Sequence, residues 1–418
     1  MIPILTSAES KRLLTRRSAR LHEAEAAVRP ILEAVRAKGD KGLIEYARKF
    51  DNFDRKSVLV PKAELEKAAA RLTPEFRKAV EVSANNVRRF AEKQLPRDYH
   101  GLFASGLKLG QIVRPLDTVG CYIPAGRYPL PSTVIMTAVP ALAAGVKNIC
   151  IACPKPLHQI QGAEVYGVAH MLGIENVFEM GGAQAIAAFA WGTRTVPRAD
   201  RIVGPGNIYV AAAKKLLAGE VGIDFVAGPT EILIIAAEGE PRFLAADMLA
   251  QAEHDTDASA VLLTTSKRLA AQVAKEIERQ LATLSTAAVA RKAIDKNSAI
   301  VIVKSLDEAA ELSNQFAPEH LSIHHEDLIP KIRHAGSIFI GPFSPEAAGD
   351  YAAGPNHVLP TSGLARLRGG LSAADYVKVI SIQHLDRRAL QKLAPAITTL
   401  ARAEGLEAHA RSIEVRLA

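Results

Sequence analysis

The segment TVGCYIPAGRYPLPSTVIMTAVPALAAGVKNICIACP, residues 118–154, decides the fold class of this 418-residue chain. Its two ends, TVGCYIP and NICIACP, are continuously apolar, which is typical of strands buried on both faces of a sheet. The stretch STVIMTAVPALAAG between them has the pattern of a helix. A strand, a helix and a second strand in this order predict a parallel βαβ unit.

The same alternation continues to about residue 340. Further strand-like runs are ENVFEM, DRIVG, EILIIA, SAVLLTT, AIVIVK and GSIFIG, and a helical segment follows each of them except the last. About nine or ten strands exceed one comfortable sheet, so we expect two α/β domains with helices on both faces of each parallel sheet. Residues 8–95 and those after about 371 are predicted to be mainly helical.

The composition excludes several classes of function. A hydrophobic content of 48% and a charged content of 23% are those of a globular protein. The net charge is +8, but the basic residues are scattered and aromatic residues make up only 5%, so we expect no nucleic-acid partner. No run of 18 apolar residues predicts a membrane span, and the N-terminus lacks the pattern of a secretory signal.

The cysteines indicate a reducing compartment. There are only three, Cys121, Cys150 and Cys153, an odd and small number that argues against a disulfide framework. The C-x-x-C spacing of CIAC lies inside an apolar run, so we interpret its cysteines as strand residues rather than a redox pair. The expected location is the cytoplasm.

Two glycine turns invite a dinucleotide interpretation. GPGNIYVAA, residues 204–212, follows a strand and opens a helix, but Tyr209 stands where the third glycine of the dinucleotide fingerprint belongs. GGAQAIAA, residues 181–188, is a second turn of this kind. Gln184 and Asn207 would lie near the helix starts, within reach of ribose or phosphate oxygens. Two ordinary tight turns remain the alternative.

The stretch AQAEHDTDAS, residues 250–259, concentrates polar groups just before an apolar run. Gln251 and His254 are three residues apart, so they share one face of a helix. Together they offer one oxygen and one nitrogen to a cation. The alternative is the solvated end of a helix.

Three further stretches carry polar side chains with chemical potential. FAPEHLSIH places Glu319 and His320 after a proline, where an adjacent carboxylate and imidazole suit proton transfer. GDYAAGPNHVLPTSG and EGLEAH supply the other candidates: Asp350, His357, Glu404 and His409. An Asp, His, Gln and His set with open positions would describe a substrate-accepting metal. Spacing alone leaves open whether these stretches meet, and each is also interpretable as a polar loop.

In combination, these motifs resemble histidinol dehydrogenase. GGAQAIAA, GPGNIYVAAAK, AGPTE, QAEHD, PEHL, GDYAAGPNHVLPT and EGLEAHARSIEVRL follow one another in the order found in that family. The resemblance covers almost the whole chain, including the N-terminal KGDKGLIEYARKFD.

The resemblance implies a role for each polar residue. The catalytic pair matches Glu319 and His320. The zinc ligands match Gln251, His254, Asp350 and His409. The substrate contacts match Thr230, His357 and Glu404, together with His320 and the four ligand positions. The NAD+ contacts match Tyr122, Gln184 and Asn207.

The resemblance also implies an architecture. It consists of two incomplete Rossmann-like domains, one inserted in the other, with helical segments at both ends. Residues 1–20 would form a helical segment, 21–121 and 232–371 the first domain with the metal and catalytic residues, and 122–231 the inserted NAD side. Residues 372–418 would form a tail that brings His409 to the partner's site in a homodimer with shared active sites.

The implied reaction is the last step of histidine biosynthesis, in which L-histidinol is oxidised to L-histidine through a bound aldehyde by two NAD+. Two departures concern the substrate side: Thr230 replaces the usual serine, and CYIPAGRYPL has Ala125 and Arg127 where the family usually has PGG. An arginine would suit an anionic substrate, so another small polar alcohol, such as a sulfonated propanediol, is the alternative. A non-catalytic metal-binding relative is a second alternative, although it would have no need of Glu319 and His320. Manganese or cobalt could replace zinc.

Overall fold

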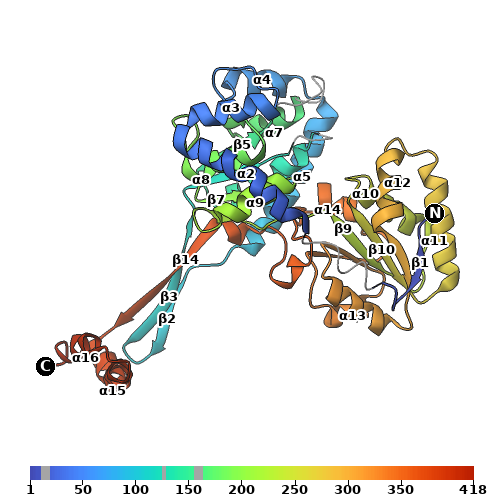
Figure 1. Cartoon of the computed structure of the whole chain (residues 1–418). Helices are drawn as coiled ribbons and strands as arrows, with labels where there is room; N and C mark the ends of the chain where they lie inside the picture. The colour runs from blue at the N-terminus through green and yellow to red at the C-terminus, as the bar shows by residue number, and fades with distance from the viewer. Residues whose placement is uncertain (11–18, 125–128, 155–162) are drawn as a thin grey trace.

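The computed structural model describes residues 1–10, 19–124, 129–154 and 163–418. In these residues the strands form a six-stranded, a five-stranded and a three-stranded sheet (Figure 1). The two larger sheets are parallel throughout, and the smaller one is antiparallel. The two α/β sheets predicted from the alternation of strands and helices are confirmed.

The five-stranded sheet has the order β6-β5-β4-β7-β8. Its strands are β4 (Thr118–Tyr122), β5 (Asn148–Cys153), β6 (Asn176–Glu179), β7 (Arg201–Val203) and β8 (Gly222–Ile223). One face carries α4 (Lys62–Ala70), α5 (Pro74–Gln94), α6 (Pro131–Ala143) and α7 (Ala163–Met171). The other carries α2 (Ala19–Lys38), α3 (Asp40–Phe50), α8 (Gly182–Trp191) and α9 (Ile208–Leu217).

Strand β5 explains the C-x-x-C spacing. Cys150 packs in the cluster on one face of the sheet, and Cys153 packs in the cluster on the other. Residues three apart on a strand point to opposite faces, so the two sulfur atoms do not face each other. All three cysteines are buried and free, and burial raises the pKa of each thiol to about 12. The interpretation of these cysteines as strand residues is confirmed.

The six-stranded sheet has the order β1-β11-β10-β9-β12-β13. Its strands are β1 (Ile4–Thr6), β9 (Glu231–Ile235), β10 (Ser259–Thr264), β11 (Ala299–Ile302), β12 (His320–Ile323) and β13 (Ser337–Ile340). One face carries α10 (Pro241–Ala252), α11 (Lys267–Leu281) and α12 (Ala287–Asn297). The other carries α13 (Leu306–Phe316) and the 3-10 helix η1 (Glu326–Lys331).

The packing of the N-terminal region differs from the predicted division of the chain. The helices α2 to α5 bury their apolar faces against the five-stranded sheet, although residues 21–121 were assigned to the domain of the other sheet. Residues 4–6 lie in strand β1, which pairs with β11, rather than in a helix. Each of the helices α2 to α5 has an apolar face to bury. The five-stranded sheet, which follows them in the chain, offers two apolar faces that these helices cover.

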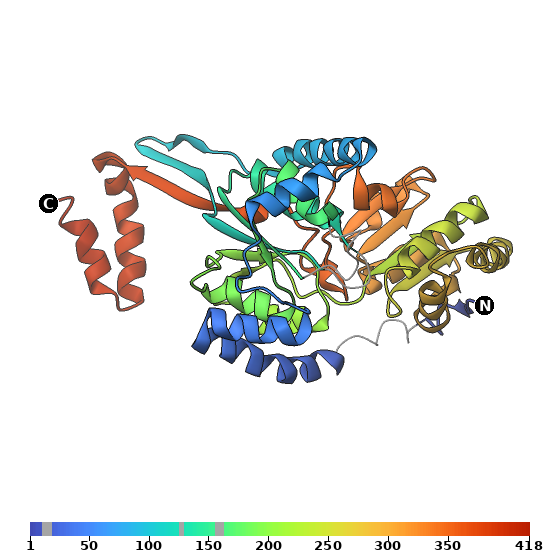
Figure 2. The same ribbon diagram turned by 90° about the horizontal axis from the view of Figure 1, so that it is seen from above.

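The third sheet forms an arm that leads away from the body (Figures 1 and 2). Its strands β2 (Tyr99–Ala104), β3 (Leu107–Pro115) and β14 (Val377–Leu385) pair in the order β14-β3-β2. Two helices, α15 (Arg387–Ala403) and α16 (Glu407–Glu414), lie at its outer end. The helical prediction after residue 371 therefore holds for α15 and α16 but missed β14. That strand exposes most of its residues, so it lacks the apolar run of a buried strand.

Three short helices complete the chain: α14 (Glu346–Tyr351), η2 (Leu364–Arg366) and η3 (Ala373–Tyr376). Helix α14 lies on the side of the six-stranded sheet that faces the five-stranded body (Figure 1). The loop after it reaches that body, because Asn356 Nδ2 donates to the Met136 carbonyl at 2.6 Å in helix α6. This contact joins the two α/β units next to the candidate site.

Candidate active site

The candidate catalytic residues lie at the amino edge of the six-stranded sheet, between β9 and β12. Chain order reverses there, since β10 and β11 lie on one side of β9 and β12 and β13 on the other. Thr230 immediately precedes β9, Glu319 immediately precedes β12, and His320 is the first residue of β12. Ligands in open α/β sheets usually bind at the carboxyl edge. This cluster uses the opposite edge, which explains why its polar residues precede apolar runs in the sequence.

Glu319 is held by two hydrogen bonds to one carboxylate oxygen. Thr230 Oγ1 donates to Glu319 Oε2 at 2.6 Å, and the backbone N–H of Glu231 donates to the same oxygen at 2.8 Å. The side chain is buried, and burial raises the pKa of Glu319, although the nearby His320 opposes the shift. Because both hydrogen bonds end at Oε2, Oε1 is the oxygen available for proton transfer.

The imidazole of His320 is oriented by the backbone. Its Nδ1 lies 3.2 Å from the Glu231 carbonyl, and a carbonyl only accepts, so Nδ1 carries a proton. Its Nε2 lies 3.6 Å from Asp350 Oδ1, beyond hydrogen-bond distance, and makes no hydrogen bond with the described residues. Burial opposes the charged ring, but Glu319, Asp350 and Glu346 raise the pKa of His320 to about 10.

Helix α10, the residues just after it and helix α14 supply three of the expected metal ligands. His254 Nε2 lies 3.9 Å from Asp350 Oδ2, and the buried Gln251 contacts Glu346 at the start of α14. Burial opposes ionisation of Asp350, but the His320 ring holds the pKa of that carboxyl below its usual value. His254 itself is about half exposed, with 46% of its side chain accessible. One end of this cluster is thus open to a ligand.

Sequence analysis missed Glu346, which is also part of the cluster. It begins α14, four residues before Asp350, so the two side chains share a helix face. It is buried, and burial raises the pKa of Glu346 strongly. Its Oε2 lies 2.7 Å from the Gln251 amide. The spacing in EAAGD was the available signal, but a glutamate at the start of a short helix is usually solvated.

His357 connects the cluster to the five-stranded unit. Its Nδ1 lies 2.9 Å from the Asp350 carbonyl, and its Nε2 lies 3.3 Å from Thr133 Oγ1 in the first turn of α6. Burial lowers the pKa of His357, so the ring is neutral at pH 7. The expected substrate residue therefore lies between the two α/β units.

The donors fit an incomplete metal site. Among the described residues, no three His, Cys, Asp or Glu side chains converge as a metal cluster. The imidazole of His254 nevertheless lies 3.9 Å from the carboxylate of Asp350, and Gln251 lies three residues before His254; imidazole, carboxylate and amide oxygen are donors that zinc accepts. A fourth donor is needed to close a tetrahedral set.

Glu404 and His409 do not join this cluster within the chain. Glu404 caps the end of α15, His409 lies in α16, and both are exposed. Both helices are at the outer end of the arm, away from the body (Figures 1 and 2). The chain alone therefore does not assemble the full set of residues that the sequence suggested.

The glycine turns lie at the carboxyl edge of the five-stranded sheet, where the strand order reverses between β4 and β7. Tyr122 ends β4, and its hydroxyl accepts from Gly182 N at 3.1 Å. Gln184 is buried and donates to Asp51 Oδ2 at 2.9 Å. Asn207 Oδ1 caps α9 by accepting from the N–H groups of its first turn. The three expected NAD+ contacts thus gather at the edge where α/β proteins bind ligands.

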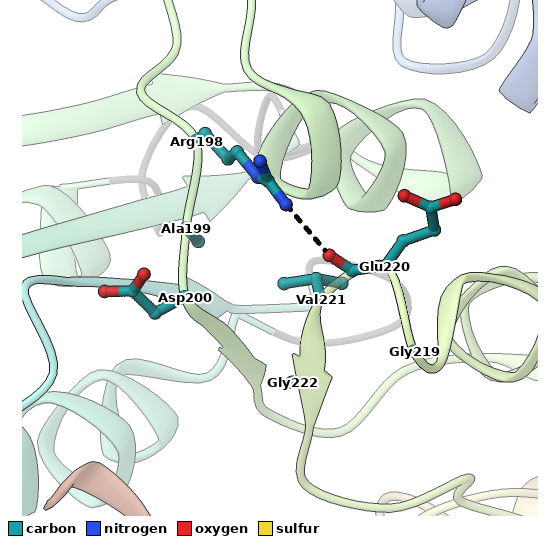
Figure 3. A pocket seen from close by; sticks show the side chains of 7 residues that line it. All are labelled: Arg198, Ala199, Asp200, Gly219, Glu220, Val221 and Gly222. Carbon is teal, nitrogen blue, oxygen red and sulfur yellow. Dashed lines mark hydrogen bonds between the residues drawn. The ribbon is translucent and has the colours of Figure 1, made fainter. Parts of the chain in front are cut away.

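The five-stranded unit also has a hollow, but it lies at the edge opposite the three expected NAD+ contacts. Figure 3 shows that it lies in front of β7 and β8, lined by Arg198, Ala199, Asp200, Gly219, Glu220, Val221 and Gly222. Arg198 Nη2 spans it by donating to the Glu220 carbonyl at 3.1 Å. These residues precede or begin their strands, so the hollow opens at the amino edge, opposite the glycine turns. Ala125 and Arg127 lie outside the described residues.

Comparisons with known proteins identify the family. Residues 14–417 match the family model described as histidinol dehydrogenase. The histidinol dehydrogenase of Geobacter sulfurreducens is 47% identical over 98% of this chain and 97% of its own length. That of Geobacter metallireducens is 48% identical over 94% and 92%.

A solved structure agrees with the sequences. The crystal structure of histidinol dehydrogenase from Elizabethkingia anophelis superposes with a TM-score of 0.93, at 36% identity, over 100% of this chain and 98% of that one. No helix in the described part of the chain is long and apolar enough to cross a membrane. The chain belongs to the histidinol dehydrogenase family and is an oxidoreductase of histidine biosynthesis.

Proposed function

We propose that the chain oxidises L-histidinol to L-histidine in two successive steps, each with one NAD+, and keeps the intermediate aldehyde bound. The observation that carries this proposal is the buried pair Glu319 and His320, which lies beside His254, Asp350 and Gln251. A proton-transfer pair next to a polar anchor suits an alcohol that must be held while it loses a proton and a hydride.

His320 is the base for the alcohol. Its Nδ1 proton is committed to the Glu231 carbonyl, so Nε2 is the atom that receives the substrate proton. The neighbouring carboxylates of Glu319 and Asp350 stabilise the charged ring that forms when Nε2 takes this proton.

Glu319 serves the second step, in which the aldehyde must take up water. Thr230 and the Glu231 N–H fix Oε2, and Oε1 accepts a proton from the water. The raised pKa of Glu319 makes it a better base than an exposed glutamate. Its burial also limits the access of bulk water to a reactive aldehyde.

Gln251, His254 and Asp350 would hold a zinc ion, with His409 of a second chain as the fourth ligand. Zinc would supply a template that binds the amino and imidazole nitrogens of histidinol and orients its carbinol carbon. His357 and Glu404 complete the substrate contacts in this proposal. Manganese or cobalt would suit the same nitrogen and oxygen donors.

The arm supports a homodimer with shared sites. It exposes large apolar side chains that a lone chain would leave in water: Leu102, Phe103, Leu400 and Val415 are 65–75% exposed. Because Glu404 and His409 lie on this arm, a second chain that buries it would receive both residues. The exchange is reciprocal in a two-fold dimer, so each site would be completed by the partner.

NAD+ would bind at the carboxyl edge of the five-stranded sheet. Tyr122, Gln184 and Asn207 lie there, and two helix starts favour its phosphates. When bound, NAD+ supplies the hydride acceptor. The contact between His357 and Thr133 joins this edge to the catalytic cluster. Three free, buried thiols favour the cytoplasm as the location.

The test is NADH formation by purified protein from L-histidinol and NAD+, with and without prior chelation. The proposal expects two NADH per histidinol and activity that is lost on chelation and restored by zinc. One NADH per alcohol would contradict the bound-aldehyde route. Turnover of a sulfonated propanediol in place of histidinol would assign the other alcohol.

A further inference from the structure

Two buried side chains from separate elements meet behind the proposed metal site. Gln251 lies in the last turn of α10, and Glu346 is the first residue of α14. Their exposed fractions are 1% and 2%. Glu346 therefore contacts the Gln251 amide where no solvent can mediate between them.

The polar groups around Gln251 favour one orientation of its amide. With the amide nitrogen toward Glu346 Oε2, that contact is a hydrogen bond of 2.7 Å. The amide oxygen then accepts from the Glu231 N–H at 3.3 Å and lies 2.5 Å from Thr230 Oγ1, whose single proton goes either to this oxygen or to Glu319 Oε2. In the reverse orientation the NH2 group would donate to Thr230 Oγ1 at 2.5 Å, but it would also meet the Glu231 N–H donor, and the amide oxygen would face Glu346 Oε2 at 2.7 Å. A buried mismatch of this kind costs about 1–3 kcal/mol.

We propose that Glu346 is a positioning residue that holds the NH2 group of Gln251, so that the amide presents its oxygen, and not its nitrogen, to the bound cation. The inference rests on the proposed metal role of Gln251. An amide ligates zinc through oxygen, whereas its NH2 group has no lone pair to offer. Residues that orient a ligand in this way typically change metal affinity 10–100-fold when they are mutated.

The experiment is a double-mutant cycle on zinc affinity, measured in the full-length protein by competition with a chromophoric chelator. Glu346→Gln supplies an amide that accepts Gln251 in either orientation, so zinc affinity should fall about 10–100-fold. A Gln251→Glu background removes the need for orientation, because a carboxylate presents oxygen on either side. In that background, Glu346→Gln should therefore change zinc affinity by much less.

The cycle separates orientation from charge. An equal loss in both backgrounds would mean that Glu346 acts only through its negative charge, and this would overturn the inference. No loss in the single variant would overturn it as well. Glu179→Gln is the matched control, since Glu179 is also 2% exposed but lies in the five-stranded unit, and it should leave zinc affinity unchanged.

A separate variant tests the proposed metal site, on which the role of Glu346 depends. His254→Ala should abolish tight zinc binding if the proposed site is correct. Unchanged zinc affinity in His254→Ala would reject the proposed metal site, and the role of Glu346 with it. Zinc binding that depends on His254 but not on Glu346 would reject only the inference drawn here for Glu346.

Discussion

Thr230 Oγ1 donates to Glu319 Oε2 across 2.6 Å, so the residue before β9 fixes the carboxylate before β12. Sequence comparison had assigned Thr230 to the substrate. The hydrogen bond adds a second task, which a serine would also perform. The hydroxyl, rather than the methyl group, is therefore the part of Thr230 that the reaction needs.

Thr230→Val should lower turnover about tenfold or more, because the variant keeps the shape of the side chain but leaves Glu319 with one donor fewer. Thr230→Ser should retain most of the activity. Thr195→Val is the control, since Thr195 donates to a different carboxylate, Asp40, at 2.9 Å. Steady-state kinetics with histidinol would check this, and full activity of Thr230→Val would contradict it.

His320→Asn should remove most of the turnover, by about 10²–10⁴-fold, because the variant loses Nε2, the proposed acceptor of the alcohol proton, which has no hydrogen-bond partner among the described residues. Zinc and NAD+ binding, measured by metal analysis and calorimetry, should persist because His320 is a ligand of neither. Near-normal activity would remove His320 from the role of base.

The reciprocal arm predicts complementation between two inactive chains. His409→Ala should lose zinc and activity, although the substitution lies on the arm. Co-expression of differently tagged His320→Asn and His409→Ala chains should restore about one quarter of the sites, since half of the dimers are mixed and each holds one intact site. A mixed dimer without activity would show that the arm does not complete the partner's site.

The sequence predicted the parts of the fold in which burial leaves a continuous apolar pattern. Strands β9 and β10 are buried at every residue, and both were predicted. Strand β2 exposes every residue, so no local pattern marked it as a strand. Helices α2 to α5 were predicted as helices, but the sheet against which they pack was not predicted correctly. An amphipathic helix shows which of its faces is buried, but not which surface covers that face.

The same limit applies to the candidate site. Glu319 and His320 were singled out locally because they stand just before an apolar run, which forms β12, but only the family resemblance predicted their catalytic role. Glu346 was missed because its burial depends on the packing of α14 against α10. Glu404 and His409 could not be placed by spacing at all, since a single chain holds them on the arm.

Replacing the carboxyl of Asp247 should raise the free energy of unfolding, by an amount that depends on pH. Burial raises the pKa of Asp247 to about 6, so the folded chain binds this proton more tightly than the unfolded chain. Its contribution to folding therefore falls as pH rises from about 4 to about 6. Asp247→Asn should be more stable than the parent by up to about 3 kcal/mol at pH 8, and by about half of that at pH 5. Urea unfolding at both pH values would check this. An equal gain at both, or the same gain from the exposed Asp327→Asn control, would contradict the assignment.

Lys214 and Lys215 are adjacent in α9, and each forms an ion pair. Loss of Lys214 should nevertheless lower stability and NAD+ binding much more than loss of Lys215. Lys214 Nζ donates to Asp224 Oδ1 at 2.7 Å and to the Gly204 carbonyl at 2.6 Å, and both charged side chains are buried. Asp224 Oδ2 in turn accepts from the Gly204 N–H at 2.8 Å. This pair therefore fixes both polar groups of Gly204, the first residue of the GPGN turn.

Lys214→Met should cost about 3–5 kcal/mol of unfolding free energy, because it leaves the Asp224 charge buried without its partner. It should also weaken NAD+ binding, since the GPGN turn loses the donor that holds it. Lys215→Met is the matched control: the Lys215 pair with Glu25 is at the surface, so its loss should change stability little. Urea unfolding and NAD+ calorimetry on both variants decide the matter. Similar effects of the two substitutions would mean that the buried pair does not hold the turn.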